Sequence, residues 1–205
     1  DKKMRLVEIL DKDKLLFNKN KSFTYNARSP VRVSFAGGGS DITSFFKNDY
    51  GAVINTTLSI YSHATIKLRK DNQIILNSID LKKRIELSLN DLFKIKTPSK
   101  FDLILNTIKS ANPNLGFELT LWTDFPMNSG LGGSSALVSS ILGCFNSAFQ
   151  KNWSKKEIAE LCFMIERIKT GINGGWQDQY STVFGGFNFI EFKEKNTVNS
   201  LRINR

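Results

Sequence analysis

The amino-acid sequence predicts an α+β domain, because strand-type and helix-type apolar periodicities both occur without a regular βαβ alternation. Apolar and polar residues alternate at 31–35 and 117–121, whereas apolar residues recur at helical spacing at 101–108 and 158–165. The 205 residues fit one large domain, or one and a half small ones, with a real core. Hydrophobic residues make up 40% and charged residues 23% of the chain, so we expect a folded globular protein.

The chain divides into a short leading segment and one domain. Residues 1–25 contain a short apolar run, LVEIL, followed by a connector rich in Lys and Asn. We interpret this segment as an N-terminal extension or linker, and we place the domain at 26–205.

The first half of that domain is predicted to be mostly strands. The run VRVSF alternates apolar and polar residues, and the glycines at 37–39 end this strand. Ser40 or Asp41 could then cap a short helix through ITSFFKN. Three further strands are expected, the last two joined by a turn at KDNQ, near residues 51–60, 61–69 and 73–79.

The second half is predicted to contain three helices and two strands. The run SKFDLILNTIKSAN forms one helix, GFELTLWT alternates as a strand, and SSALVSSILGCFNSAF forms the next helix. Ser154 and Glu157 form a capping box that starts a further helix, which should end before Gly171. The run GGFNFIEF, residues 185–192, is predicted to be the last strand.

The charge distribution disfavours nucleic acid as a partner. The formal net charge of +10 favours anionic partners in general. However, Lys outnumbers Arg and is spread along the chain, and no dense basic run with interleaved aromatic residues occurs. We interpret the charge as general surface charge with a local bias towards an anionic substrate.

Cysteine and histidine usage excludes several kinds of site. Cys144 and Cys162 lie in helical apolar patterns without CxxC spacing, which predicts buried free thiols in a reducing cytoplasm. His63 is the single histidine, which argues against a Ser-His triad and against a multi-histidine metal site. The first residues are too charged for a signal peptide, and no apolar run reaches membrane-spanning length, so a cytoplasmic protein without a membrane partner is expected.

The stretch FPMNSGLGGSSAL, residues 125–137, combines closely spaced glycines with two serines. It stands between a predicted strand and a predicted helix, an arrangement in which loop amides and the helix N-terminus bind an anion such as phosphate. Ser134 and Ser135 can add hydroxyl donors or bind Mg²⁺. The stretch is neither a Walker A motif nor a GxGxxG motif. The alternative is a flexible connection whose small residues allow close helix packing.

Phosphoryl transfer also needs Mg²⁺ ligands, a group that orients or deprotonates the attacking hydroxyl, and a nearby cation. Arg32 and Asp41 flank the first glycine turn, whereas Glu166 and Asp178 flank a second glycine-containing loop. Each has a simpler structural interpretation: Glu166 as a solvated helix residue, Asp41 as a helix cap, and Arg32 as a strand-edge residue. Asp178 lies between two glutamines after Gly-Gly, a pattern typical of sugar-binding loops.

Together, three stretches resemble the three motifs of the GHMP kinase superfamily, named for galactokinase, homoserine kinase, mevalonate kinase and phosphomevalonate kinase. They are RSPVRVSFAGGGSD, PMNSGLGGSSAL and IERIKTGINGGWQDQYSTVFGGFNFIEF. The third resembles the sugar 1-kinase branch with D-glycero-D-manno-heptose 7-phosphate kinase and the kinase part of bacterial L-fucokinase. The resemblance covers about residues 26–192 in order.

The resemblance implies a role for each site residue. Asp178 would be the catalytic residue that accepts or orients the sugar hydroxyl proton, supported by Arg32, and Ser134 and Glu166 would bind Mg²⁺. Gly133 departs from the pattern because the family has a serine there. The nucleotide phosphates of ATP would be held by Asn128, Ser129, Gly130, Leu131, Gly132, Gly133, Ser134 and Ser135. The sugar would be held by Gly38, Gly39, Asp41 and Gln177.

The resemblance further implies a fold and an activity. The fold would be the ribosomal-protein-like two-layer α/β N-terminal half of a GHMP kinase, with the C-terminal half absent. The activity would be ATP-dependent phosphorylation of the anomeric hydroxyl of a heptose 7-phosphate, so the partner is a small sugar or sugar phosphate. Two alternatives stay open: an L-fucose-type sugar 1-kinase, which Trp176 slightly favours, and a catalytically silent nucleotide- or sugar-binding fragment.

Overall fold

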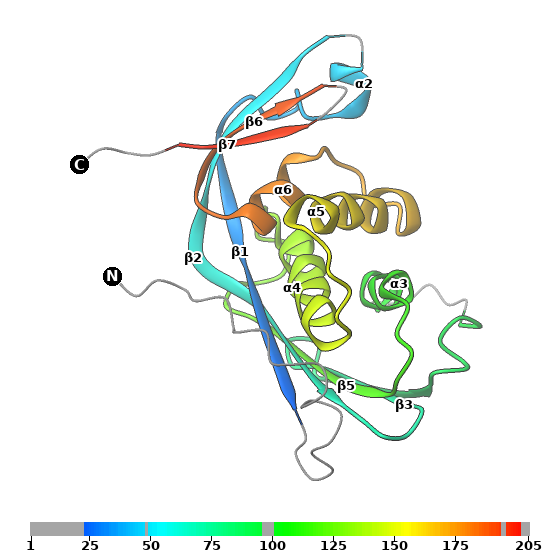
Figure 1. Ribbon diagram of the computed structural model, residues 1–205. Helices are drawn as coiled ribbons and strands as arrows, with labels where there is room; N and C mark the ends of the chain where they lie inside the picture. Colours follow the sequence, from blue (N-terminus) through cyan, green and yellow to red (C-terminus); the bar gives the residue numbers. More distant parts are fainter. Residues whose placement is uncertain (1–22, 48, 96–100, 194–195, 202–205) are drawn as a thin grey trace.

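The computed structural model describes residues 23–47, 49–95, 101–193 and 196–201. A seven-stranded sheet forms one layer, and the longer helices pack against one of its faces as a second layer (Figure 1). This arrangement confirms the predicted α+β class.

The sheet has the strand order β4-β3-β5-β2-β6-β7, and β1 pairs with β2 as an additional edge. Its strands are β1 (Thr24–Ala36), β2 (Gly51–Leu68), β3 (Gln73–Ser78), β4 (Lys83–Ser88), β5 (Phe117–Thr123), β6 (Phe187–Phe192) and β7 (Thr197–Ser200). The helices are α2 (Thr43–Phe46), α3 (Asp102–Ala111), α4 (Gly133–Ala148), α5 (Lys155–Phe163), the π-helical segment η1 (Met164–Lys169) and α6 (Gln177–Phe184).

Strand β2 is longer than predicted. Instead of separate strands at 51–60 and 61–69, one continuous strand runs along β1. On its other side, residues 51–56 pair with β6 and residues 62–68 pair with β5, both antiparallel. The intervening sequence TLSIY contains neither Gly nor Pro, so the chain stays extended and changes its partner instead of turning.

The turn predicted at KDNQ lies between β2 and β3, but these strands do not form a hairpin. Strand β5 lies between them, antiparallel to β2 and parallel to β3. Strands β4 and β7 were not predicted from the sequence. Their sequences, KRIELS and TVNS, carry few apolar residues because each pairs only at the margin of the sheet.

The core lies between the helices and the face of the sheet that they cover. Its largest cluster contains Ile66 and Leu119 from the sheet, Ile108 from α3, and Leu142 and Phe145 from α4, all fully buried. Burial of such side chains contributes about 1.5–3 kcal/mol each to folding. Helix α4 is therefore fixed against β1 and β2, which places its N-terminus at one end of the sheet.

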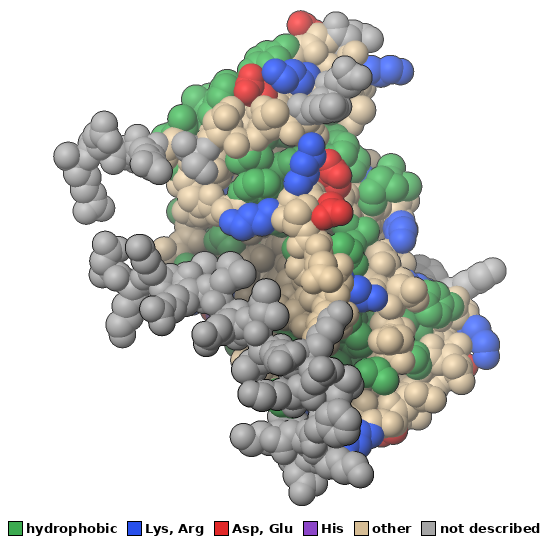
Figure 2. Space-filling model, viewed as in Figure 1, with side chains coloured by type: hydrophobic (Ala, Val, Ile, Leu, Met, Phe, Trp, Pro, Cys, Tyr) green, Lys and Arg blue, Asp and Glu red, His purple; other side chains and the backbone are tan. Residues whose placement is uncertain are grey.

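The two cysteines lie in this core as free, buried thiols, Cys144 on α4 and Cys162 on α5, as predicted. Among the described residues, no helix combines the length and apolar composition needed to cross a bilayer. Lys and Arg side chains are scattered singly over the face shown in Figure 2.

The predicted capping box is present. The Ser154 Oγ accepts a hydrogen bond from the Glu157 backbone N–H, and the Ser154 backbone N–H donates to the Glu157 carboxylate. Helix α5 continues into η1, which ends at Lys169. Gly171 follows with a left-handed backbone, at a φ of +75°. Both predicted boundaries of this helical segment are confirmed.

The predicted cap of the short helix is wrong. Helix α2 spans four residues, its N-cap is Ile42, and no side chain caps it. Ser40 and Asp41 instead form hydrogen bonds within the preceding glycine turn and across to other segments. Strand β1 begins at Thr24, before the expected domain start at 26. Most of the predicted N-terminal extension, residues 1–22, lies outside the described residues.

Candidate active site

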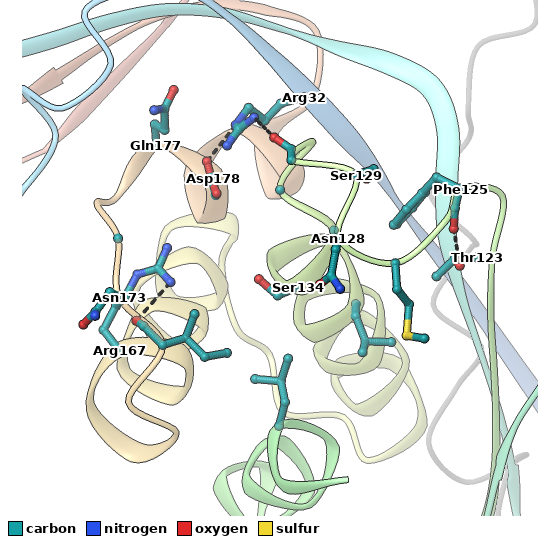
Figure 3. A pocket seen from close by; sticks show the side chains of 18 of the residues that line it. Arg32, Thr123, Phe125, Asn128, Ser129, Ser134, Arg167, Asn173, Gln177 and Asp178 are labelled. Carbon is teal, nitrogen blue, oxygen red and sulfur yellow. Dashed lines mark hydrogen bonds and ion pairs between the residues drawn. The ribbon is translucent and has the colours of Figure 1, made fainter. Parts of the chain in front are cut away.

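A cavity of about 830 Å³ lies where segments from several parts of the chain meet (Figure 3). They include β1 and the turn after it, the ends of β3 and β5, helix α3, the loop at 126–132 before α4, and the connection at 170–176 before α6. The glycine-containing loop at 126–132 and the glycine-containing connection at 170–176, which are far apart in the sequence, thus border the same cavity. Many of its polar residues lie in the loop before α4 and at the start of α6, whereas α3 contributes apolar side chains.

Arg32 joins three of the segments around the cavity. The pairing register of β1 with β2 shifts between Pro30 and Arg32, and the Arg32 backbone N–H donates to the Leu131 carbonyl over 3.0 Å. The Arg32 Nε donates to the Asp178 Oδ1 over 2.7 Å, and its Nη1 donates to the Gly130 carbonyl over 3.0 Å. The ion pair is shielded, since the Arg32 and Asp178 side chains are 15% and 18% exposed.

Asp178 lies in the first turn of α6, not in a loop as the sequence suggested. Its Oδ2 receives no hydrogen bond from a described residue. A Cβ added to Gly132 would lie 3.5 Å from this oxygen, so the carboxylate sits beside the glycine loop. One oxygen is therefore held by Arg32, and the other is available to a bound hydroxyl.

The loop ahead of α4 has the geometry of an anion site. Asn128, Gly130 and Gly132 adopt positive φ angles of 63°, 73° and 76°. The first amides of the 16-residue helix α4 have no acceptor within the helix, and its dipole favours an anion. The residues of the predicted phosphate site that line the cavity are Asn128, Ser129, Gly130, Gly132, Gly133 and Ser134.

Gly133 stands where the resemblance expects a serine, and the structure shows what replaces that side chain. A Cβ added to Gly133 would lie 2.7 Å from Cε2 of Phe125. The phenyl ring thus occupies the space that a side chain at 133 would need. The serines that follow keep separate positions, Ser134 on the cavity wall and Ser135 in the core.

The expected pairing of Ser134 with Glu166 is not the one observed. Glu166 is fully buried and does not line the cavity, and its Oε2 accepts hydrogen bonds from Ser135 Oγ and Gln179 Nε2, each over 2.5 Å. Successive helical residues point about 100° apart, and here Ser134 lies on the cavity wall whereas the Ser135 side chain is fully buried. Ser135 therefore contributes its side chain to the core and not to a phosphate. Burial and the Glu166 charge raise the pKa of the nearby Cys162 thiol well above its usual value.

A Mg²⁺ ion on the nucleotide phosphates would need oxygen ligands from the protein near the cavity. No cluster of three or more His, Cys, Asp or Glu side chains that could hold a metal occurs among the described residues. Mg²⁺, however, commonly binds through one or two protein oxygens plus substrate phosphates and water. The Glu166 Oε1 has no hydrogen-bond partner in the described part of the chain, and Ser134 lines the cavity. The Ser134 hydroxyl on the cavity wall and the unpartnered Glu166 oxygen buried behind it are donors that remain for an ion that takes most of its ligands from a nucleotide.

Asp41 acts as a bridge between the first and third motifs. Its Oδ1 accepts from the Gly39 N–H over 3.0 Å and its Oδ2 from the Gln177 N–H over 3.1 Å, although the residue is 2% exposed. A Cβ on Gly175 would lie 2.0 Å from the Asp41 Oδ2, so only glycine permits this close approach. Gly39, Asp41 and Gln177 line the cavity, and Gly38 does not.

Several cavity residues were not singled out in the sequence. Arg167, Ile172, Asn173 and Gly174 line the side that leads to α6. The only sequence signal for them is their position within the third motif. The apolar end was missed because its residues read as ordinary core, and it is formed by Leu81, Leu103, Ile104, Leu121, Phe125 and Leu137.

Trp176 does not line the cavity. Its ring stacks on Phe163 with 3.5 Å between the ring centroids, and its Nε1 donates to the Thr43 Oγ1 over 2.9 Å. The side chain therefore packs α6 against α5 and α2, so its identity carries no direct information on the sugar.

Comparison with known proteins identifies the domain. Residues 100–186 match the family described as the GHMP kinases N terminal domain. This chain carries a GHMP kinase N-terminal domain. It is 38% identical over 187 residues to the D-glycero-alpha-D-manno-heptose 7-phosphate kinase of Campylobacter jejuni, a match covering 88% of this chain and 55% of that protein. It is 30% identical over 189 residues to the L-fucokinase/L-fucose-1-P guanylyltransferase of Bacteroides fragilis, covering 80% and 20%.

Solved structures agree with this GHMP kinase assignment. The crystal structure of a D-glycero-D-manno-heptose 1-phosphate kinase from Bacteroides thetaiotaomicron matches with a TM-score of 0.81 and 30% identity. The match covers 89% of this chain and 61% of that one. The fold predicted from the resemblance is thus confirmed, and the chain spans about half the length of the heptose kinase that it matches.

Proposed function

We propose that this GHMP kinase domain binds ATP and carries the catalytic aspartate of a sugar kinase. The observation that carries the proposal is the Arg32–Asp178 pair beside the N-terminus of α4, at a cavity bordered by all three motifs. In this proposal residues 26–205, with β1 starting slightly earlier, form the ATP-binding domain, and residues 1–25 precede it.

The cavity offers a separate place for each part of ATP. The phosphates lie along the loop at 128–133 and the first amides of α4, where backbone donors and the helix dipole favour negative charge. The nucleoside lies at the apolar end between α3 and β5, because ligand sites are mostly apolar with a few placed polar groups. The acceptor sugar lies on the remaining side, beside Gly39, Asp41 and Gln177.

The chemistry follows from the two oxygens of Asp178. Arg32 holds Oδ1, so Oδ2 accepts the proton of the sugar hydroxyl as that oxygen attacks the γ-phosphorus of ATP. The bond from the γ-phosphorus to the β–γ bridging oxygen breaks, and ADP leaves. Arg32 also places positive charge beside the glycine loop, where the transferred group lies. Mg²⁺, when bound, neutralises charge on the phosphate oxygens, and Ser134 and Glu166 are the residues that would hold it.

The proposed substrate is a heptose 7-phosphate, phosphorylated at its anomeric hydroxyl. The chain is more similar to the heptose kinase, at 38% identity, than to the fucokinase, at 30%. L-fucose is the second candidate because the fucokinase similarity extends over 80% of this chain. Trp176 gives fucose no additional support, since the side chain does not line the cavity.

The test is ADP release from Mg-ATP with D-glycero-D-manno-heptose 7-phosphate and, in parallel, with L-fucose. We expect sugar-dependent ADP release, faster with the heptose 7-phosphate. Nucleotide binding without ADP release with either sugar would instead support a catalytically silent binding fragment. A chain that binds no nucleotide would contradict the kinase, and a chain that binds neither nucleotide nor sugar would contradict the binding fragment as well.

A further inference from the structure

Arg167 is a cation on the cavity wall that the proposed chemistry does not use. Arg32 and Arg167 are the two cationic residues that line the cavity in the described part of the chain. Arg32 is paired with Asp178, whereas Arg167 forms no ion pair with a described carboxylate. Its charge therefore remains available to a bound anion.

The guanidinium is positioned by a loop and not by an acid. The Nε and Nη2 of Arg167 donate to the Gly175 carbonyl over 3.3 and 3.1 Å, and Nη1 donates to the Ile172 carbonyl over 3.3 Å. An arginine has five N–H donors, so two remain. Gly174 allows this packing, since a Cβ there would lie 2.7 Å from Nη2.

The same loop presents unused backbone donors. The amides of Asn173, Gly174 and Gly175 donate no hydrogen bond to a described residue, and all three residues line the cavity. Consecutive free amides beside a guanidinium favour an anion. Figure 3 shows Arg167 on the side of the cavity that carries Gln177 and Asp178, whereas Ser134 lies on the α4 side.

We propose that Arg167 and the amides of 173–175 form a second anion site, which binds a phosphate carried by the acceptor sugar away from the reacting hydroxyl. The nucleotide phosphates are expected at α4, so an anion on the α6 side belongs to the acceptor. This inference rests on the proposed function, and it adds Arg167 as the residue that selects a phosphorylated sugar. Planar arginine suits a phosphate because it donates two parallel hydrogen bonds.

The test measures binding, so that it does not depend on turnover. The chain is titrated calorimetrically with D-glycero-D-manno-heptose 7-phosphate and with the same heptose lacking the phosphate, each in the presence of Mg²⁺ and a non-hydrolysable ATP analogue. Arg167→Gln should weaken binding of the sugar phosphate about 10-fold or more and leave the plain sugar unchanged, since hydrogen bonds to charged groups contribute about 1.5–3 kcal/mol. Arg167→Lys should lose part of the affinity.

Lys169→Gln is the matched control, because it removes one positive charge two residues away. The Lys169 Nζ donates to the Ser110 Oγ, and the residue does not line the cavity. If Arg167→Gln weakened the binding of both sugars equally, the proposal would be overturned. The role of Arg167 would then be to position the loop. Weaker binding of the ATP analogue alone would also overturn it, because the anion would then belong to the nucleotide.

A further experiment distinguishes failure of the anion-site proposal from failure of the sugar-kinase proposal. If the chain binds neither sugar, the sugar-kinase proposal fails, and the anion site is then tested with inorganic phosphate in the presence of saturating ADP. Phosphate binding that Arg167→Gln removes and Lys169→Gln preserves would support the site. Phosphate binding that is absent, or insensitive to Arg167, would contradict it.

Discussion

At the scale of single residues, Asp178 carries the proposed proton transfer. Asp178→Asn keeps the size of the side chain and an oxygen for Arg32, but it removes the basic carboxylate. We expect kcat to fall on the order of 10²–10⁴-fold, the usual contribution of a positioned general base. ATP affinity, measured by calorimetry, should stay close to the wild-type value because the phosphate loop is unchanged.

The control for this variant is Asp91→Asn, which alters an exposed carboxylate bonded to Ser88 and Lys94. Its kcat should match that of the wild type. Turnover by Asp178→Asn at the wild-type rate would exclude the proposed mechanism. Loss of ATP binding by the same variant would show that Asp178 shapes the site and that its role is not confined to the proton.

Substitutions of Ser134 and Ser135 should have different effects, because Ser134 lies on the cavity wall whereas Ser135 is buried beside Glu166. Ser134→Ala should weaken Mg²⁺-dependent nucleotide binding about 3- to 10-fold, the value of one hydrogen bond or ligand contact, without a change in stability. Ser135→Ala removes a partner from the buried Glu166 and should lower the free energy of unfolding by about 1–3 kcal/mol. Chemical denaturation and calorimetry measure the two effects.

The opposite pattern, a stability loss with Ser134→Ala and a binding loss with Ser135→Ala, would mean that the observed register of the two serines is wrong. It would also restore the pairing that the sequence resemblance implies.

The site residues show how far sequence reasoning reaches. The resemblance to the family motifs predicted that Arg32 supports Asp178, and the two side chains are in contact although they are 146 positions apart. No local sequence pattern could have predicted this contact. The partner of Glu166 was missed because the side-chain direction within GGSSAL depends on where α4 starts and how it packs. Arg167 was missed because its neighbours, two backbone carbonyls, leave no trace in side-chain chemistry.

At the scale of elements, helix α5 depends on its capping box. Ser154→Ala removes the acceptor for the Glu157 N–H and should lower the free energy of unfolding by about 1 kcal/mol. The hydrogen bond from Ser154 lowers the pKa of the Glu157 carboxyl. A carboxylate with a lowered folded-state pKa stabilises the fold above its unfolded pKa, and this is lost as the pH falls through the folded value. The difference between wild type and variant should therefore shrink below about pH 4.3.

Urea denaturation at neutral and acidic pH measures this difference. Lys155→Ala, one position later, is the control, because it leaves the capping hydrogen bonds in place. A difference between Ser154→Ala and the wild type that stays constant down to pH 3 would contradict the coupling of the cap to Glu157.

Elements with strong local signals were predicted, and those defined by their partners were not. Helices α3, α4 and α5 have apolar stripes and, for α5, a capping box, so their positions follow from the sequence. Strands β4 and β7 are short and pair with one neighbour each, so they carry few apolar residues and give a weak signal in the sequence. Helix α6 was taken for a loop because the glycines and amides before and within it conceal its start.

At the scale of the whole molecule, the cavity depends on contacts between segments that lie early and late in the sequence. Arg32 comes from the first strand and Asp178 from a helix near the end, and Asp41 joins the loops between them. The helix-covered core holds these segments in place, so loss of the core removes the site. Global stability and the proposed activity are therefore coupled.

The buried thiols offer a test of that core. Burial raises the pKa of the Cys144 thiol to about 12, and burial together with the Glu166 charge raises that of Cys162. Unfolded cysteine ionises at about pH 8.5, so above this pH the unfolded chain binds fewer protons than the folded chain. The free energy of unfolding should then decrease with rising pH, by up to about 1.4 kcal/mol per pH unit for each thiol.

Urea denaturation between pH 7.5 and 9.5 measures this slope before lysine and tyrosine titrate, and Cys144→Ala should reduce it by the share of one thiol. Fully buried alanine in place of cysteine also leaves a small cavity, so the absolute stability falls and only the slope is compared. A wild-type slope of zero would mean that the thiols are not desolvated and that the packing of α4 and α5 on the sheet is looser than described. The same looseness would separate Glu166 from Ser135 and disturb the N-terminus of α4, so the proposed phosphate site would fail together with the core.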